Sequence, residues 1–307
     1  MKNDLLKYLC CPNCKSDLTA NKKYLFCRVC NKKYQINNGI VNMLPGLNKE
    51  IKLSVEKWDE RYKEQLQSET FYKDYENYLR TYYQDTFRQL NYVKRIKDIV
   101  YLEIGCGPFF LGQKIADKCK LIIGIDFAPS GLVIARKMLE EKGIKNYLLI
   151  QGDILRMPIK ENLIDLIYGG GVIEHFKNTQ KSVDEIYRVL RKNGVSFNTV
   201  PLLNLGALTY RQIWGHIPNF PLLKEITEFI HIKLLKGKHM IFGYEMSFMS
   251  SSLNKMHLKS GFRKVAVDKF EVNIYFEFIP ALLRSPLIWL AKNSKLFWPV
   301  VKVIGTK

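Results

Sequence analysis

Short apolar runs alternate with longer amphipathic segments through the middle of the chain. The runs are rich in isoleucine, leucine and valine, which is typical of strands buried on both faces of a parallel sheet. In the segments between them, apolar side chains recur at helical spacing. The pattern predicts strands at 99–104, 121–126, 147–150, 163–168 and 195–200, and helices at 109–118, 129–142 and 183–191. This alternation predicts an α/β fold with a doubly wound parallel sheet.

The segments on either side of this series are predicted to be helical or to complete the sheet. Residues 48–98 carry aromatic side chains at i, i+3 and i+4 spacing, which predicts a helical flank; a substrate-facing aromatic surface is the alternative. Residues 202–247 are predicted to form a cap insertion over the ligand site, because ligands bind at the carboxyl ends of the strands in such sheets. A helix over 248–260 and strands over 262–270 and 272–278 should follow.

A glycine turn follows the first predicted strand. Glu103 precedes Gly105-Cys106-Gly107, so the turn has the pattern acid-x-Gly-x-Gly. A dinucleotide fingerprint would need a third glycine where Phe110 stands, and no Gly-Lys-Ser/Thr follows as it would in a phosphate-binding loop. The turn therefore indicates a nucleotide site of another kind.

With these residues the chain resembles the class I S-adenosylmethionine (SAM) dependent methyltransferases. Their first motif is Glu/Asp-x-Gly-x-Gly-x-Gly, and this chain departs from it at Phe109. Asp126, Gly152-Asp153, Glu174-His175 and the turn at 188–194 extend the resemblance to the type 11 group over residues 95–270. The resemblance implies a Rossmann-like, seven-stranded methyltransferase sheet within residues 99–278.

The resemblance also implies where SAM binds. Asp126 lies nineteen residues after Gly107, the separation expected of a carboxylate that accepts hydrogen bonds from ribose hydroxyls. Asp153 is implied to accept from the adenine amino group, with Ile154 and Phe127 on the two faces of the ring. The full expected set is Glu103, Gly105, Cys106, Gly107, Asp126, Phe127, Ser130, Asp153, Ile154, Gly169 and Gly170.

The candidate catalytic pair, Glu174 and His175, follows the fourth predicted strand. His175 is the candidate general base because imidazole ordinarily titrates near neutrality, and Glu174 could orient it. The alternative is a structural role, since Glu-His is widespread at this position in the resembled family. Some ubiquinone-pathway O-methyltransferases bind a metal through Glu-x-x-Glu-His, but here Gly171 replaces the first glutamate.

Residues 1–47 are predicted to be a zinc ribbon. Cys11, Cys14, Cys27 and Cys30 form two Cys-x-x-Cys knuckles, a spacing suited to a closed structural Zn²⁺ site, with Cys10 as an extra thiol. A unit this short has too little core to fold without such a cross-link. The following segment, through Pro45, resembles the zinc-ribbon activator subunits of RNA and protein methyltransferases and the zinc finger of ribosomal RNA guanine methyltransferases.

Composition bears on partners and location. The 307 residues carry a formal charge of +19, which favours polyanionic partners or reflects a lysine-rich proteome. The N-terminus does not have the pattern of a signal peptide, and no apolar run reaches the ~18 residues of a membrane span. Seven cysteines, five of them before residue 31, indicate metal binding in a reducing cytosol, so we expect a cytoplasmic protein.

Residues 279–307 are predicted to be a basic aromatic tail. They contain no acidic residue, and lysines and arginine alternate with leucines and tryptophans. Such a composition is typical of a segment in peripheral contact with a membrane, and packing on the sheet is the alternative.

These features support one function and two alternatives. The first is a SAM-dependent methyltransferase acting, at oxygen, on a small-molecule, glycan or lipid-linked acceptor. The second is a ribosomal guanine N-methyltransferase, favoured by the ribbon and the charge but not by Gly-Gly-Val-Ile-Glu-His, which differs from the Asn/Asp-Pro-Pro-Tyr loop of exocyclic-amine enzymes. The third is a non-catalytic binding module.

Overall fold

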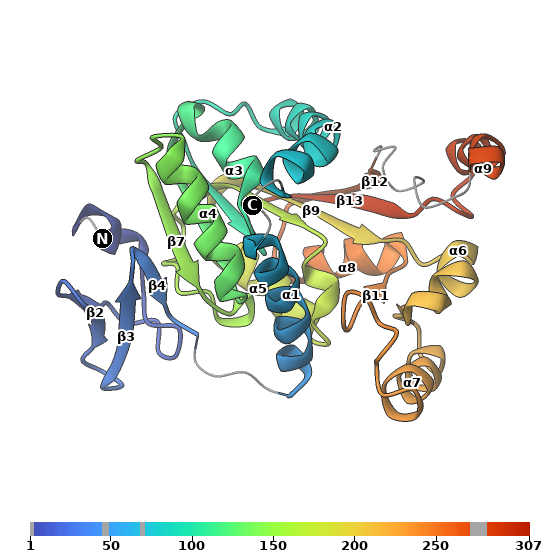
Figure 1. Cartoon of the computed structure of the whole chain (residues 1–307), viewed down its shortest axis with the longest axis horizontal. Helices are drawn as coiled ribbons and strands as arrows, with labels where there is room; N and C mark the ends of the chain where they lie inside the picture. The colour runs from blue at the N-terminus through green and yellow to red at the C-terminus, as the bar shows by residue number, and fades with distance from the viewer. Residues whose placement is uncertain (1–2, 45–48, 68–70, 271–280) are drawn as a thin grey trace.

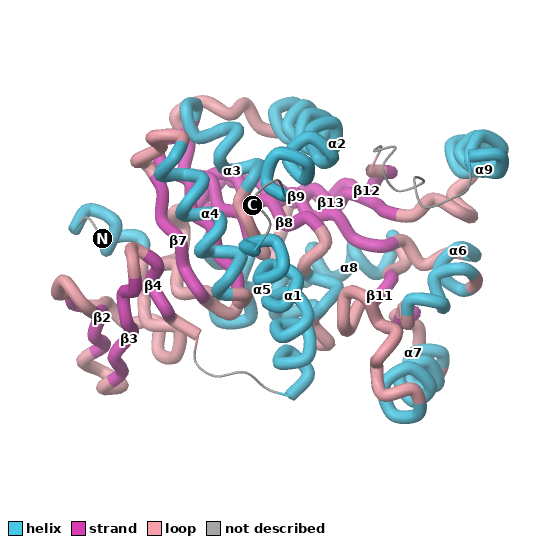
Figure 2. The backbone as a smooth tube through the Cα atoms, viewed as in Figure 1, coloured by secondary structure: helices cyan, strands magenta, loops and turns pink. Residues whose placement is uncertain are grey.

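The computed structural model describes residues 3–44, 49–67, 71–270 and 281–307. A long twisted sheet crosses the molecule, with helices on both of its faces (Figures 1 and 2). Its strand order is β1-β2-β3-β4-β7-β6-β5-β8-β9-β13-β12. Six of the seven predicted strands lie in this 11-stranded sheet, residues 300–306 supply a seventh, and the N-terminal ribbon adds its own four strands to one edge.

Seven strands make up the rest of the sheet. They are β5 (Ile99–Ile104), β6 (Cys119–Asp126), β7 (Tyr147–Gln151), β8 (Ile164–Gly170), β9 (Leu190–Pro201), β12 (Lys264–Lys269) and β13 (Val300–Thr306). The first five run parallel, and β13 is antiparallel to both of its neighbours, β9 and β12. The carboxyl ends of the parallel strands consequently meet at one edge, where the glycine turn lies.

Helices cover the two faces of this sheet. The helices packed on the sheet are α2 (Phe71–Val93), α3 (Phe110–Ile115), α4 (Pro129–Glu141), α5 (Thr179–Val189) and α8 (Ser250–Ser260). Helix α1 (Lys49–Gln67) packs on α4, and α9 (Ala281–Asn293) lies beyond β12 and β13 (Figure 1). Buried side chains of α2, α3 and α4 share one apolar cluster, and those of α5 and α8 belong to another, which packs on the opposite face. This two-sided burial explains why β5 is buried along its whole length.

The C-terminal segment differs from the expected tail. Residues 300–306 are strand β13, which lies inside the sheet rather than on a surface. Val303 is fully buried and pairs with Asn198 of β9. Buried and half-buried positions alternate from Val301 to Thr306 as they do in a strand, whereas the sequence of this run does not alternate between apolar and polar residues. Of the expected tail, residues 281–293 form α9; the expected strand at 272–278 lies outside the described residues.

The N-terminal ribbon is joined to the sheet by its last strand. Its strands are β1 (Thr19–Ala20), β2 (Tyr24–Cys27), β3 (Lys32–Asn37) and β4 (Ile40–Asn42). β4 pairs parallel with β7, opposing Val41 to Ile150, and the Met43 amide donates to the Gln151 carbonyl at 2.8 Å. The ribbon thereby covers the edge of β7, which would otherwise present unpaired backbone groups.

The cap lies between β9 and α8. It contains α6 (Leu205–Leu208), β10 (Ile217–Pro218), α7 (Leu223–Glu228), a π-helical segment Phe229–Leu234 and β11 (Met246–Ser247). Lys57 of α1 donates from Nζ to the Gly237 carbonyl at 2.9 Å, and the Trp58 ring stacks on Phe242 at 5.9 Å between centroids. These contacts attach the cap to α1 through Gly237 and Phe242.

Candidate active site

The turn after β5 is held by two buried carboxylates. Gly105 and Gly107 have φ of +59° and +47°, which glycine adopts without strain. Asp126, at the end of β6, accepts the Gly107 amide at 2.7 Å and the Ala128 amide at 2.7 Å. Burial, partly offset by these donors, raises the pKa of Asp126 to about 6.

Glu103 occupies the end of β5, below the same turn. Its Oε2 accepts from the Tyr101 hydroxyl at 2.9 Å and from the Gly112 amide at 3.1 Å, so it joins β5 to α3. Burial raises the pKa of Glu103 to about 8, although both donors act in the opposite direction. The carboxyl group is therefore largely protonated at neutral pH.

Phe109 stands where the resembled family has its third glycine. It adopts the left-handed conformation, with φ of 62°, immediately before α3 begins. Its fully buried ring belongs to the apolar cluster of α3 and β6 and does not line the cavity described below. The turn is thus kept in a glycine-like conformation while the aromatic ring points into the core.

A cavity of about 180 Å³ opens at the carboxyl ends of β5, β6 and β8. Of the residues expected to bind SAM or to act as base, seven line it: Glu103, Gly105, Cys106, Asp126, Phe127, Gly170 and His175. Glycines 107 and 169, and Ser130, Asp153, Ile154 and Glu174, are not among its lining residues. The sheet edge therefore brings about half of the predicted set together.

The expected residues outside the lining have local structural contacts. Asp153 accepts the Leu155 amide at 2.9 Å and so caps a short 3₁₀ turn, and Ile154 is buried in the core. The Ser130 amide donates to Asp59 of α1 at 2.8 Å. A Cβ on Gly169 would lie 2.9 Å from Ile104 side-chain atoms, so glycine there permits β5 and β8 to approach.

Aromatic side chains that the motifs did not identify form much of the rest of the wall. Trp58 and Tyr62 come from α1, Tyr82 and Tyr83 from α2, and Tyr168 from β8. A Cβ on Gly107 would lie 3.0 Å from Cζ of Tyr62 and nearer still to its hydroxyl, so this ring covers the glycine turn. The helical spacing of aromatics before the first strand was the available sequence signal.

His175 is held by the cap rather than by Glu174. Its Nδ1 lies 2.6 Å from the carbonyl oxygen of Tyr244. Because a carbonyl can only accept, Nδ1 carries the proton, and Nε2 of a neutral ring is left as the proton acceptor. Tyr244 in turn donates from its hydroxyl to Glu228 of α7 at 2.6 Å, so the cap orients the ring.

Glu174 is buried beside this histidine. Its Oε1 would lie 3.6 Å from a Cβ on Gly171, and among the described residues no partner lies within hydrogen-bonding distance of its Oε2. Burial, with Glu245 nearby, raises the pKa of Glu174 well above its ordinary value. This direction follows because a buried ionised carboxylate is costly, and the backbone donors of Glu174 and Val172 offset that cost only in part.

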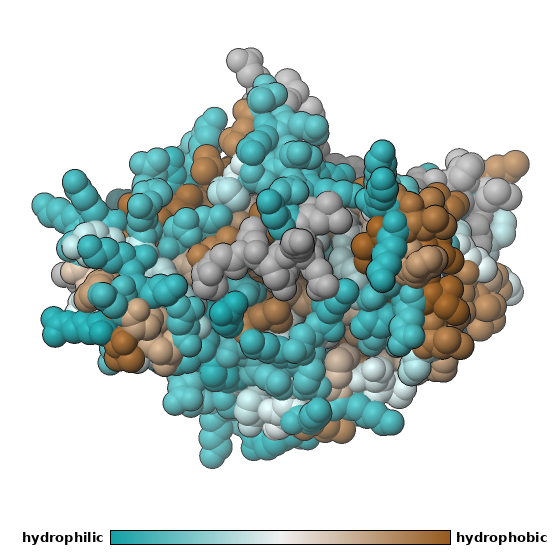
Figure 3. All heavy atoms as spheres, turned by 90° about the horizontal axis from the view of Figure 1, so that it is seen from below, coloured by the Kyte–Doolittle hydropathy of each residue, from teal (hydrophilic) through white to brown (hydrophobic). Residues whose placement is uncertain are grey.

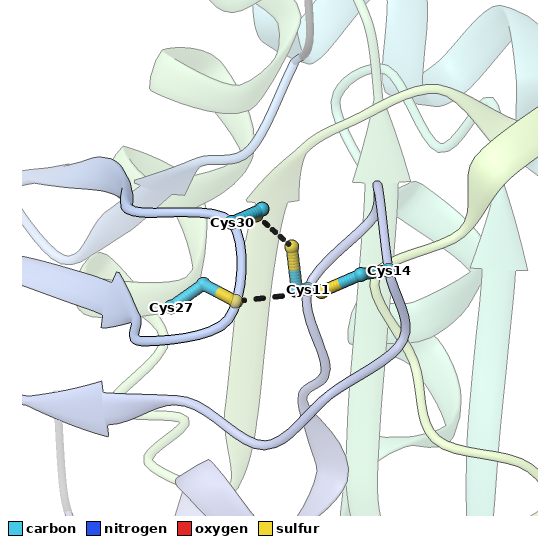
Figure 4. Close-up of side chains that lie close together, drawn as sticks. All are labelled: Cys11, Cys14, Cys27 and Cys30. Carbon is cyan, nitrogen blue, oxygen red and sulfur yellow. Dashed lines mark hydrogen bonds between the residues drawn. The ribbon is translucent and has the colours of Figure 1, made fainter.

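Four cysteines of the ribbon converge on one point (Figure 4). The Sγ atoms of Cys11 and Cys30 lie 3.4 Å apart, as do those of Cys14 and Cys27, and all four lie within 4.8 Å of one another. A tetrahedral Zn²⁺ with ~2.3 Å bonds to sulfur needs sulfur separations of about 3.8 Å. Cys10 is outside the cluster, and burial raises the pKa of its thiol to about 11.

The fold is also found in solved methyltransferase structures. A chain of the complex between the Haloferax volcanii Trm112 methyltransferase activator and the putative methyltransferase superposes with a TM-score of 0.52 and 13% identity, covering 85% of this chain and 99% of that one. The Haemonchus contortus phosphoethanolamine N-methyltransferase 2, in complex with SAM, gives a TM-score of 0.51 at 16% identity, covering 73% and 52%. These superpositions show that the chain shares its α/β fold with methyltransferases.

The sequence comparisons relate part of this chain to methyltransferases. Residues 96–202 match the family described as "Methyltransferase domain". A demethylmenaquinone methyltransferase of Thermus thermophilus is 32% identical over 33% of this chain and 46% of its own length. A malonyl-[acyl-carrier protein] O-methyltransferase of Serratia marcescens is 28% identical over 41% and 49%. The alignments thus span about half or less of these relatives' lengths.

Proposed function

We propose that this protein transfers a methyl group from SAM to the oxygen of a small-molecule, glycan or lipid-linked acceptor. The observation that carries the proposal is that Glu103, Asp126 and His175 line the same cavity at the carboxyl edge of the sheet. Of these groups, Asp126 is suited to the ribose hydroxyls, and the glycine turn lets the backbone approach the methionine half of SAM.

His175 is proposed as the general base. In the transfer, the acceptor oxygen forms a bond to the methyl carbon as the bond from that carbon to sulfur breaks, and the hydroxyl proton passes to Nε2. The Tyr244 carbonyl supports this role, because it holds the proton on Nδ1 and leaves the Nε2 lone pair available. Glu174 is proposed as a neutral neighbour of this histidine and not as its hydrogen-bonded partner.

Helix α1 is proposed to move when SAM binds. The cavity of about 180 Å³ is smaller than the ~300–1,000 Å³ usual for ligand sites of this kind. Tyr62 narrows it by lying against Gly107, and Asp59 joins the same helix to α4 through the Ser130 amide. A shift of α1 would open the turn and would then enclose the cofactor with Trp58 and Tyr62.

The choice of acceptor class rests on the relatives and on the cap. The two relatives named above act, by their names, on acyl-carrier-protein-linked malonate and on demethylmenaquinone. RNA is the second candidate acceptor, because the chain has a net charge of +19 and a ribbon of the type found in RNA methyltransferase systems.

The four cysteines are proposed to hold a structural Zn²⁺, since four thiolates leave no open position for chemistry.

A labelled-methyl experiment tests the function directly. Purified protein and SAM carrying a labelled methyl group are added to cell extract separated into RNA, lipid and small-molecule fractions. We expect label in the lipid or small-molecule fraction, and His175→Gln should lower its rate of incorporation by about 10²–10⁴-fold while calorimetry still detects binding of S-adenosylhomocysteine. Label in the RNA fraction alone would favour an RNA acceptor. The absence of binding heat with both SAM and S-adenosylhomocysteine would refute the proposed function.

A further inference from the structure

One end of the molecule exposes an unusual amount of apolar surface. Of the 22 large apolar side chains that are exposed in the described part of the chain, 16 lie in residues 205–241 or 282–296. Figure 3 shows them gathered at the end that carries α6, α7 and α9 in Figure 1. We call this the apolar face and represent it by its most exposed members, Ile213, Leu222, Phe229, Leu234, Leu282 and Trp289.

The cap and the segment after α9 are attached to each other at this end. The Asn204 side-chain amide donates to the carbonyls of Lys295 and Trp298 at 2.8 Å, and the Gly206 amide donates to the Leu296 carbonyl at 3.2 Å. Because these bonds join the start of α6 to residues 295–298, the apolar side chains of both segments belong to one structural unit.

The same segments are strongly basic. Residues 205–241 contain five lysines and arginines against two glutamates, and residues 282–296 contain three and no acid. One of the two glutamates, Glu228, is already engaged by the Tyr244 hydroxyl and by Lys177 at 3.7 Å. Large apolar side chains and a tryptophan interspersed with lysines are typical of a surface that binds at a lipid interface. There the apolar side chains are buried among the lipids and the lysines contact anionic headgroups.

A second copy of this chain would fit the face less well. Two identical faces brought together would place like charges opposite one another, in a protein whose total formal charge is already +19. An anionic bilayer supplies the opposite charge along the whole face. No described helix is long and apolar enough to cross a membrane, so the contact would be peripheral.

We propose that the apolar face docks this protein on an anionic lipid surface and that the acceptor is taken from that surface. The link to the acceptor rests on the proposed methyl transfer. The cap reaches the cavity at two places: Phe242 stacks on the cavity residue Trp58, and the Tyr244 carbonyl holds His175. Docking of the cap would therefore bring the cavity and the proposed general base, His175, close to the lipid surface.

Vesicle flotation of the full chain tests the docking. We expect the protein to float with vesicles of equimolar phosphatidylglycerol and phosphatidylcholine, and less with phosphatidylcholine alone or at ~1 M salt, where charges are screened over about 3 Å. Phe229→Asp combined with Leu234→Asp should lower the affinity by about tenfold or more for each side chain. Tyr92→Asp is the matched control, because Tyr92 is 92% exposed but lies at the end of α2, away from this face.

Calorimetry with S-adenosylhomocysteine separates the two proposals. The Phe229/Leu234 variant should bind it as the wild type does, which shows that the fold is intact. Failure of the wild type to float, or flotation of the variant equal to the wild type, would overturn the docking proposal. The docking proposal would also be overturned if light scattering showed the wild type to be a dimer and the variant to be a monomer. Flotation without binding of S-adenosylhomocysteine would instead refute the methyl-transfer function and leave the docking standing.

Discussion

The ring of Phe109 occupies the space that a side chain on Gly112 would need. A Cβ built on Gly112 would lie 2.5 Å from Cδ2 of Phe109, with two further ring atoms closer still. A Cβ on Gly124 of β6 would lie 3.3 Å from Cδ1 of the same ring, with Sγ of Cys106 and Cδ2 of Leu149 nearer still. The departure at position 109 from the resembled family's third glycine is accommodated by glycines that the ring packs against.

A double-mutant cycle tests this relationship. Phe109→Ala should lower the free energy of unfolding by about 3–5 kcal/mol, because it opens a cavity in the core and leaves the left-handed backbone in place. Gly112→Ala alone should also destabilise, by collision with the ring, but in the Phe109→Ala background the added methyl enters the vacated space. Denaturant unfolding should show the double variant more stable than the sum of the single effects, and strict additivity would contradict the packing.

The buried Glu103 should make stability depend on pH. Its pKa is about 8 in the folded protein against an ordinary 4.5, so the folded state binds more protons between these values. Its contribution to stability is therefore fully present below pH ~4.5 and is lost as the pH rises through about 8. Glu103→Gln keeps an oxygen for Tyr101 and Gly112 without the charge.

Thermal unfolding across this range should separate the two proteins. The wild type should lose stability toward pH 8 more steeply than Glu103→Gln, and the variant should be the more stable at alkaline pH. Parallel curves for the two proteins would show that Glu103 is not the group that titrates. The exposed substitution Glu161→Gln provides a control for the loss of one carboxylate.

His175 should affect turnover without affecting cofactor affinity. His175→Gln removes the proposed base and should lower kcat by about 10²–10⁴-fold, while the affinity for S-adenosylhomocysteine changes little. His239→Gln is the control, because this histidine lies in the cap and its Nε2 contacts His231 rather than the cavity. Equal losses in the two variants would assign His175 a structural role.

Metal removal should destabilise the edge of the sheet as well as the ribbon. Cys27→Ser or treatment with a chelator should release β4 from β7, since the proposed metal supplies much of the ribbon's folding energy. Hydrogen exchange should then increase at 147–151. Cys10→Ala, which changes a neighbouring buried thiol outside the cluster, should retain bound zinc by elemental analysis. A zinc-free wild type with a protected β7 would contradict the prediction.

Strand β13 should be indispensable for folding. Val303→Asp places a charge at a fully buried position between β9 and β12, and we expect insoluble or unfolded protein. Lys302→Gln, at the neighbouring half-buried position, should be tolerated because its side chain reaches the amide oxygen of Gln89 at the surface. A folded Val303→Asp variant would mean that residues 300–306 are dispensable for the sheet.

The sequence alone determined the elements whose signal is local. Buried parallel strands are read from continuous apolar runs, the nucleotide turn from the spacing of Gly105 and Gly107, and the cysteine cluster from two close pairs. Tertiary structure decided what depends on distant parts of the chain meeting. β13 enters the sheet from the C-terminus, Tyr62 covers the turn from a helix that precedes it, and Tyr244 fixes the tautomer of His175 from 69 residues away. No spacing encodes such contacts, because they follow from how buried faces pack together once the sheet has formed.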